Sequence, residues 1–307
     1  MARKWWAAFV LALILASGGL YYVWDEASTR LEAEFGRWSE AQRAQGWRIA
    51  YAAPLRTGFP LSAALKLDGL RIEAPNGLGW RSERATLALF PQDHRQLHLT
   101  LEGAQQLTHP RGTMPVLSQN LSLRLRLDGQ GGTLEGESLR FGEELEVRRL
   151  SANLFGPALD LRADQLVAKG LPRIDTLHLT GRLTHPPAAT AAAWRQMGGA
   201  LNIERAELRT GEVIALLTAT LTLDAALQPE GRGNLRVSGV QEAVTTLAGM
   251  GLIAPNLVPT LRTVLGIAAR VPPEGGPPRV EMPLELRNRR LTALRLPMGV
   301  MPAIDWR

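Results

Sequence analysis

The five histidines are the residues in this sequence best suited to metal binding or proton transfer. His94 and His98 are four residues apart, a spacing that would place two imidazoles on one side of a helix, where they could share a metal ion. Pro91 precedes them, however, and polar and apolar residues alternate over 96–102, which predicts a loop that enters a strand. The pair is therefore interpreted as surface histidines, and no metal site is predicted.

Sequence patterns of common catalytic sites are absent: there is no H-E-x-x-H, no G-x-S-x-G and no Walker-type loop. The run Gly129-Gln130-Gly131-Gly132 lies between two alternating segments, which indicates a turn between strands and not a phosphate-binding loop. Acidic residues stand singly along the predicted strands, so a glycosidase-like pair could form only from residues distant in sequence. We predict no catalytic residue and no cofactor.

Composition narrows the possible partners. The net charge of +6 comes almost wholly from arginine, and no basic run contains interleaved aromatic residues, so nucleic acid is not an expected partner. The absence of cysteine excludes disulfides, cysteine-ligated zinc, a cysteine nucleophile and a lipid-modified cysteine. Hydrophobic residues make up 45% of 307 residues, enough for a sizeable core.

The segment from Trp5 to Trp24 is predicted to be a transmembrane helix. It carries no charge, and its twenty residues would span about 30 Å, the thickness of the hydrocarbon core of a bilayer. Aromatic residues that favour the headgroup zones stand at both ends. These predicted anchor residues are Trp5, Trp6, Tyr21, Tyr22 and Trp24.

Charges around this segment predict its orientation. Arg3 and Lys4 precede it, which places the N-terminus in the cytoplasm and most of the chain in the periplasm, as in a single-pass inner-membrane protein. A cleaved signal peptide is the alternative, with Phe9–Leu15 as its apolar region and a small-residue site at 16–18. The uncharged run continues past that site, which favours an uncleaved anchor.

The rest of the chain is predicted to be mainly β. Residues 25–46 form an amphipathic helix with Leu31, Phe35 and Trp38 on one face. After it the hydrophobic period becomes two, and an irregularity at Gly69 suggests a bulge. The resulting fold class is an N-terminal transmembrane helix followed by an antiparallel, curled or sandwich-like β-rich domain with a few helices. Its predicted parts are residues 1–24, 25–46, 47–184 and 185–307, the last with a helical insertion at 241–269.

The clearest alternation places Leu121, Leu123, Leu125 and Leu127 on one face, with Ser122 and arginines on the other. Similar strands are predicted near 84–90, 96–102, 133–140, 145–154, 158–167, 174–183, 200–208, 213–227, 231–238, 279–286 and 290–296. So many leucine-rich strands make a long apolar face. Such a face either closes on itself as an ordinary core or stays partly open, and in an open sheet these four leucines would face lipid.

Several short stretches resemble a bacterial family called domain of unknown function 2125. They are Gly58-Phe59-Pro60, Leu70-Arg71-Ile72, residues 199–204, Leu221-Thr222-Leu223-Asp224, Pro229-Glu230-Gly231, Leu235-Arg236-Val237, residues 284–288 and Leu296-Pro297-Met298-Gly299 with Pro302. The resemblance covers nearly the whole chain after the anchor. This family is in turn similar to the AsmA-like envelope proteins, which implies an inner-membrane anchor, a β-sheet groove and a link to lipid transport.

The favoured function is therefore that of a non-enzymatic envelope protein, anchored in the inner membrane, that binds or helps to move membrane lipid or supports envelope assembly. One alternative is a scaffolding module that binds another envelope protein through an exposed edge strand. Another is an envelope hydrolase whose site is assembled from distant residues.

Overall fold

The computed structural model describes residues 2–109, 112–185, 190–249, 256, 258–271, 275, 277–293 and 296–304; side chains are described from residue 17 on, except at 247 and 296–298. The chain divides into two compact units, residues 1–129 (unit 1) and residues 130–307 (unit 2). Strand pairs within each unit are antiparallel, so the predicted mainly β fold is confirmed. The predicted division between residues 184 and 185 lies inside unit 2.

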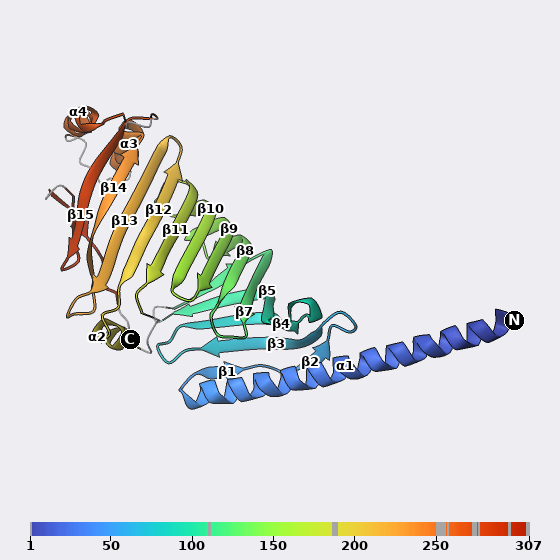
Figure 1. The fold of residues 1–307 in the computed structure, drawn as a ribbon. Helices are drawn as coiled ribbons and strands as arrows, with labels where there is room; N and C mark the ends of the chain where they lie inside the picture. Colours follow the sequence, from blue (N-terminus) through green and yellow to red (C-terminus); the bar gives the residue numbers. More distant parts are fainter. Residues whose placement is uncertain are drawn as a thin grey trace. The chain divides into compact units, whose positions relative to one another are not determined.

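Unit 1 consists of one long helix and a sheet (Figure 1). Its elements are α1 (Ala2–Ala44), β1 (Arg48–Ala50), β2 (Leu55–Thr57), β3 (Ala63–Glu73), β4 (Gly79–Leu89), a 3-10 turn at Pro91–Asp93, β5 (Gln96–His109), β6 (Gly112–Leu117) and β7 (Asn120–Arg126). In the sheet β3 pairs with β4, β4 with β5, and β5 with both β6 and β7, while the short β1 and β2 both pair with β3.

The helix α1 continues through Asp25, so the predicted parts 1–24 and 25–46 belong to one helix. Exposed ion pairs one turn apart, Glu26 with Arg30 and Glu34 with Arg37, support this part of the helix. The helix ends at Ala44, two residues before the predicted bound at residue 46.

The predicted membrane span is not supported by the structure. Among the described residues no helix is both long enough and apolar enough to cross a bilayer. The side chains of Trp5 and Trp6 and of the apolar run Phe9–Leu15 lie outside the described residues.

The core of unit 1 lies between α1 and the sheet. Leu31 packs with Leu65 and Leu87, and Phe35 also contacts the neighbouring cluster around Leu67. Leu65 and Leu67 are fully buried. Leu31 and Phe35 of the predicted amphipathic face therefore pack on the sheet, whereas Trp38 is 43% exposed. The helix α1 runs alongside β3 in the same direction (Figure 1).

A row of bulges crosses unit 1 at the predicted irregularity. Gly69 of β3 has φ +64°, β4 shifts register against β5 between Ser82 and Arg84, and Gly103 of β5 has φ +75°. Because neighbouring strands shift together, Leu67 and Leu70 both point into the core although they are three residues apart.

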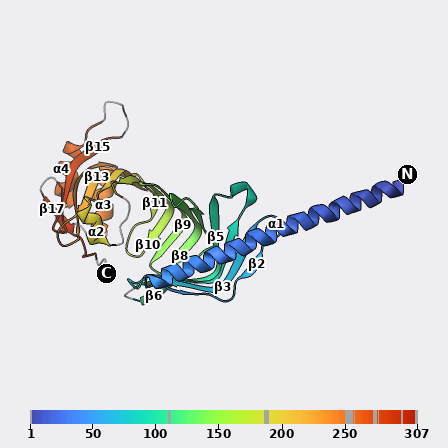
Figure 2. The ribbon, with the colours of Figure 1, turned by 60° about the horizontal axis from the view of Figure 1, so that its bottom comes forward.

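Unit 2 is a longer antiparallel meander, whose strands follow one another around a curve (Figure 2). Its strands are β8 (Gly131–Phe141), β9 (Leu145–Phe155), β10 (Ala158–Ala168), β11 (Ile174–Leu183), β12 (Leu201–Thr210), β13 (Val213–Leu223), β14 (Pro229–Ser238), β15 (Arg279–Arg287), β16 (Arg290–Ala293) and β17 (Leu296–Val300), and its helices are α2 (Ala191–Gln196), α3 (Val240–Gly249) and α4 (Val258–Ala268). The helix α3 lies against β13, and its Val240 and Val244 are buried.

One predicted strand of unit 2 is longer than the strand in the structure. The strand predicted to end at 227 ends at Leu223, because the Asp224 carboxylate accepts hydrogen bonds from the backbone N–H groups of Ala226 and Gln228 and so forms a turn. The helical insertion predicted at 241–269 is described as two helices, α3 and α4.

Candidate functional site

The predicted leucine face exists in unit 1 as a ladder across strands. In the register between β5 and β7, Leu121, Leu123 and Leu125 stand opposite Leu101, Leu99 and Leu97, respectively. The ladder continues through Leu87, opposite Leu99, to Leu65, opposite Leu87. Cross-strand neighbours this close form one continuous apolar surface from β3 to β7. Leu127 lies one residue beyond the end of β7.

The helix α1 covers only part of this surface. Under the helix Leu65 is fully buried and Leu87 is 6% exposed. On β7, Leu121 is still buried, but Leu125 is 38% exposed and Leu127 is 57% exposed. The apolar surface of unit 1 is therefore closed on the β3 side and open at one end of β7.

Unit 2 carries a similar face. Cross-strand pairs along it include Leu161 with Leu179, Leu177 with Leu208, Leu217 with Leu235, and Leu235 with Met282. All of these residues are partly exposed.

The buried leucines and valines of the described strands of unit 2 all stand within two residues of a strand end. They are Leu139, Val147, Val213, Leu223, Val280 and Leu286. In an ordinary sandwich the middle of each strand is the best-buried part, because the facing sheet covers it. The mid-strand leucines of this face are instead only partly buried, although the smaller Ala163 in the middle of β10 is buried.

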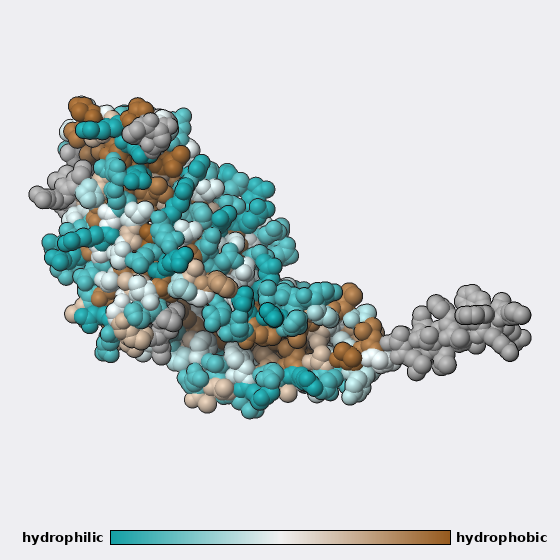
Figure 3. Space-filling view, in the orientation of Figure 1, coloured by the Kyte–Doolittle hydropathy of each residue, from teal (hydrophilic) through white to brown (hydrophobic). Residues whose placement is uncertain are grey.

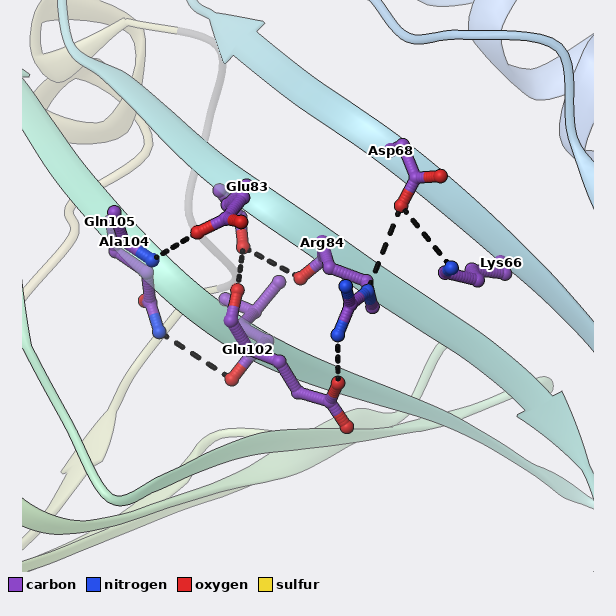
Figure 4. A network of polar contacts seen from close by, with 9 residues as sticks. Lys66, Asp68, Glu83, Arg84, Glu102, Ala104 and Gln105 are labelled. Carbon is purple, nitrogen blue, oxygen red and sulfur yellow. Dashed lines mark hydrogen bonds and ion pairs between the residues drawn. The ribbon is translucent and has the colours of Figure 1, made fainter.

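The opposite face of unit 1 carries charges. Lys66 and Arg84 both pair with Asp68 at 3.7 Å, and Arg84 also pairs with Glu102 at 3.4 Å (Figure 4). An open hollow of about 660 Å³ lies over these strands, lined in part by Lys66, Arg84, His98 and Glu102. Each carboxylate in Figure 4 is engaged by a cation or a backbone N–H group, which is the pattern of an ion-pair ladder on a strand face.

On the polar face of unit 2, carboxylates are likewise paired with cations or other hydrogen-bond donors. Hydrogen bonds from Arg205 and then Arg209 lower the pKa of the nearly buried Glu207 below its usual value. Hydrogen bonds from Arg236 and Asn234 likewise lower the pKa of Glu281. Both shifts come from structural partners on neighbouring positions or strands, and they keep these carboxylates ionised.

The two histidines singled out in the sequence have different surroundings. His98 lies 3.3 Å from Asp93 and edge-on to Phe90, while His94 is exposed. Within the described residues no group of three or more histidine, aspartate or glutamate side chains could hold a metal ion.

Three of the predicted anchor aromatics, Tyr21, Tyr22 and Trp24, lie where α1 leaves the sheet. Tyr21 and Tyr22 are 55% and 71% exposed. The Trp24 indole N–H donates hydrogen bonds to the carbonyl oxygens of Ser62, at 3.0 Å, and Thr57, at 3.3 Å. The loop that contains Gly58-Phe59-Pro60 thus holds the helix to the sheet. In the sequence this motif is recognised only as part of the family resemblance. Its role in holding the helix depends on hydrogen bonds from Trp24 to residues more than thirty positions away, which the sequence does not reveal.

Comparison with family models gives one match. The family, described as an uncharacterized protein conserved in bacteria (DUF2125), covers residues 24–302. The chain belongs to this family. The predicted membership in the DUF2125 family is therefore confirmed, and the match includes both apolar faces and the loop that binds Trp24. Comparisons with curated proteins and with solved structures find no match.

Proposed function

We propose that this DUF2125 protein is a non-enzymatic envelope protein that binds or helps to move membrane lipid, with acyl chains lying on its apolar sheet faces. The observation that carries the proposal is the long face of unit 2, whose mid-strand leucines are partly exposed. An acyl chain that shields about 300 Å² of apolar surface would gain about 7 kcal/mol before the entropic costs of binding.

Two further features support the proposal. The uncharged run from Trp5 to Trp24 would hold the domain beside a lipid reservoir, as a single-pass anchor in the inner membrane with most of the chain in the periplasm. The resemblance to AsmA-like envelope proteins, stated above, also points to lipid handling.

Lipid contact can be tested with photo-crosslinking residues in the full-length protein. Crosslinkers at Leu161 and Leu125 would lie on the apolar faces, and crosslinkers at the adjacent Arg162 and Arg124 would lie on the opposite faces. We expect adducts with phospholipid at the two leucine positions and not at the arginine positions, together with co-purifying lipid in mass spectra.

Other outcomes would contradict the proposal. Crosslinks only within the protein would indicate a closed core. Crosslinks to a second envelope protein would favour the scaffolding function. The anchor is tested separately with a reporter fused to the C-terminus. Reporter activity that requires a cytoplasmic location would refute the predicted topology. A mature chain that starts near Gly19 would show that the N-terminal segment is cleaved, and would leave the export of the domain unchanged.

A further inference from the structure

An exposed apolar collar surrounds the point where α1 leaves the sheet of unit 1. On the helix, Leu20, Tyr21, Tyr22 and Val23 are 48%, 55%, 71% and 65% exposed. On the sheet side the loop at this level carries Phe59 and Leu61, which are 47% and 71% exposed. Figure 3 shows apolar side chains gathered in this region, where α1 lies against β2 and β3 in Figure 1.

The two halves of the collar are fixed at the same level along the helix. The Phe59 ring lies 5.9 Å from Tyr21 and 5.6 Å from Trp24, centre to centre, and Trp24 is hydrogen-bonded to the backbone on both sides of the loop. Just beyond the collar, Arg56 of β2 binds Glu32 at 2.7 Å and Asp25 at 3.4 Å. The loop therefore cannot slide along the helix without breaking these contacts.

The change from apolar to charged residues occurs at this level on both segments. On α1 the uncharged run ends at Trp24, and Asp25 and Glu26 follow it. On the sheet side the apolar Phe59 and Leu61 lie in the loop, and Arg56 of the preceding strand donates hydrogen bonds to the carboxylates of Glu32 and Asp25 on α1. Aromatic rings at such a boundary, with apolar residues on one side and charges on the other, are typical of a membrane–water interface.

The collar lies at the same end of the sheet as the open part of the apolar ladder. Ala63 directly follows Ser62, which binds Trp24, and the register runs from Ala63 to Leu89, to Leu97 and to Leu125. Three strand spacings separate β3 from β7, a distance of about 14 Å. The exposed Leu125 and Leu127 are thus on the row of the sheet nearest to the collar.

We propose that the collar inserts into the interfacial zone of the phospholipid bilayer and so seats unit 1 with the open end of its apolar ladder at the membrane surface. This inference rests on the proposed function, since it requires the uncharged run of α1 to lie in the bilayer. An acyl chain leaving the membrane beside the collar would then meet Leu125 and Leu127 without crossing water. Because α1 and β3 run side by side, the strands would stand upright on the membrane.

The cysteine-free chain allows a direct test of depth with single cysteines in the full-length protein. Leu61→Cys would be labelled with the fluorophore NBD and reconstituted in bilayer nanodiscs of phosphatidylcholine and phosphatidylglycerol. Nitroxide lipids labelled at the headgroup or deep in the acyl chain would serve as quenchers. Ala12→Cys reports the uncharged run, and Leu78→Cys, which is also exposed but at the opposite end of the β3–β4 hairpin, is the matched control.

We expect headgroup nitroxides to remove most of the fluorescence at position 61 and little at position 78, while deep nitroxides quench position 12. Quenching at 12 without quenching at 61 would overturn the collar and leave the anchor standing. Absence of quenching at both positions would overturn the anchor and the collar together.

A second experiment tests the consequence for lipid transfer. Leu61→Ser should reduce lipid crosslinking at Leu125 severalfold, and Leu78→Ser should leave it unchanged. Both side chains are largely exposed, so the fold does not depend on either. Equal crosslinking at Leu125 in both variants would show that the collar does not position the ladder.

Discussion

Removing one leucine under α1 and one at the open end of the same face should have clearly different effects on stability. Leu65→Ala deletes three carbon atoms from a fully buried side chain. At about 0.8 kcal/mol per buried CH₂ the loss is about 2.4 kcal/mol, and the cavity left between α1 and the sheet raises it to about 3–4 kcal/mol. Leu125→Ala makes the same chemical change at a side chain that is 38% exposed. Scaling by the buried fraction leaves about 1.5 kcal/mol, with no closed cavity to add to it.

The two variants should therefore differ by about 2 kcal/mol, more than a tenfold change in the unfolding equilibrium. Urea unfolding of the full-length protein in nanodiscs, followed by far-UV circular dichroism, would measure the free energy of unfolding of each variant. Equal losses would show that the face is closed over β7 in solution and would refute the open groove. A loss below about 1 kcal/mol for Leu65→Ala would show that α1 does not cover the sheet as described.

Three further predictions follow from the two faces. Leu123→Asp should destabilise unit 1 by several kcal/mol in urea unfolding, because it places a carboxylate in the leucine ladder, whereas Arg124→Ser on the polar face should cost less than about 1 kcal/mol. Hydrogen bonds from its arginine partners lower the pKa of Glu207 in the folded protein below the ordinary value of 4.5. The ionised Glu207 should therefore stabilise the fold above pH 4.5, and this stabilisation should be lost as the pH falls through the lower folded pKa. The free energies of unfolding of the wild type and of Glu207→Gln should converge at this low pH. Gly231→Ala should strongly lower the melting temperature, because a Cβ would collide with a backbone carbonyl of β13, while Gly249→Ala has open space and should not.

The match to the DUF2125 family places the apolar faces and the collar loop inside one family domain. The loop motif Gly58-Phe59-Pro60 contributes an exposed ring that contacts Trp24, and the carbonyl oxygens of Thr57 and Ser62 on either side of it accept hydrogen bonds from the Trp24 indole. If the collar seats the domain on the membrane, this motif has a mechanical role in function.

The sequence by itself determined the strands and the two sides of each strand. A period of two is a local property, so the alternation from Leu121 to Leu127 is enough to assign the leucine face, and Gly69 is enough to locate the bulge. The strand predicted to reach 227 was too long because apolar residues continue past Asp224. The turn begins at Asp224 because its carboxylate accepts a hydrogen bond from the backbone N–H of Ala226.

Only the tertiary structure decided which part of the apolar face is covered. Leu65 and Leu125 have the same type and the same position in the alternation, yet one is fully buried and the other is 38% exposed. The difference depends on where α1 lies across the sheet, which is set by contacts between residues such as Trp24 and Ser62 that are far apart in sequence. Local periodicity shows which side chains share a face of the sheet. Whether that face is buried, and whether lipid can reach it, depends on the elements that pack against it.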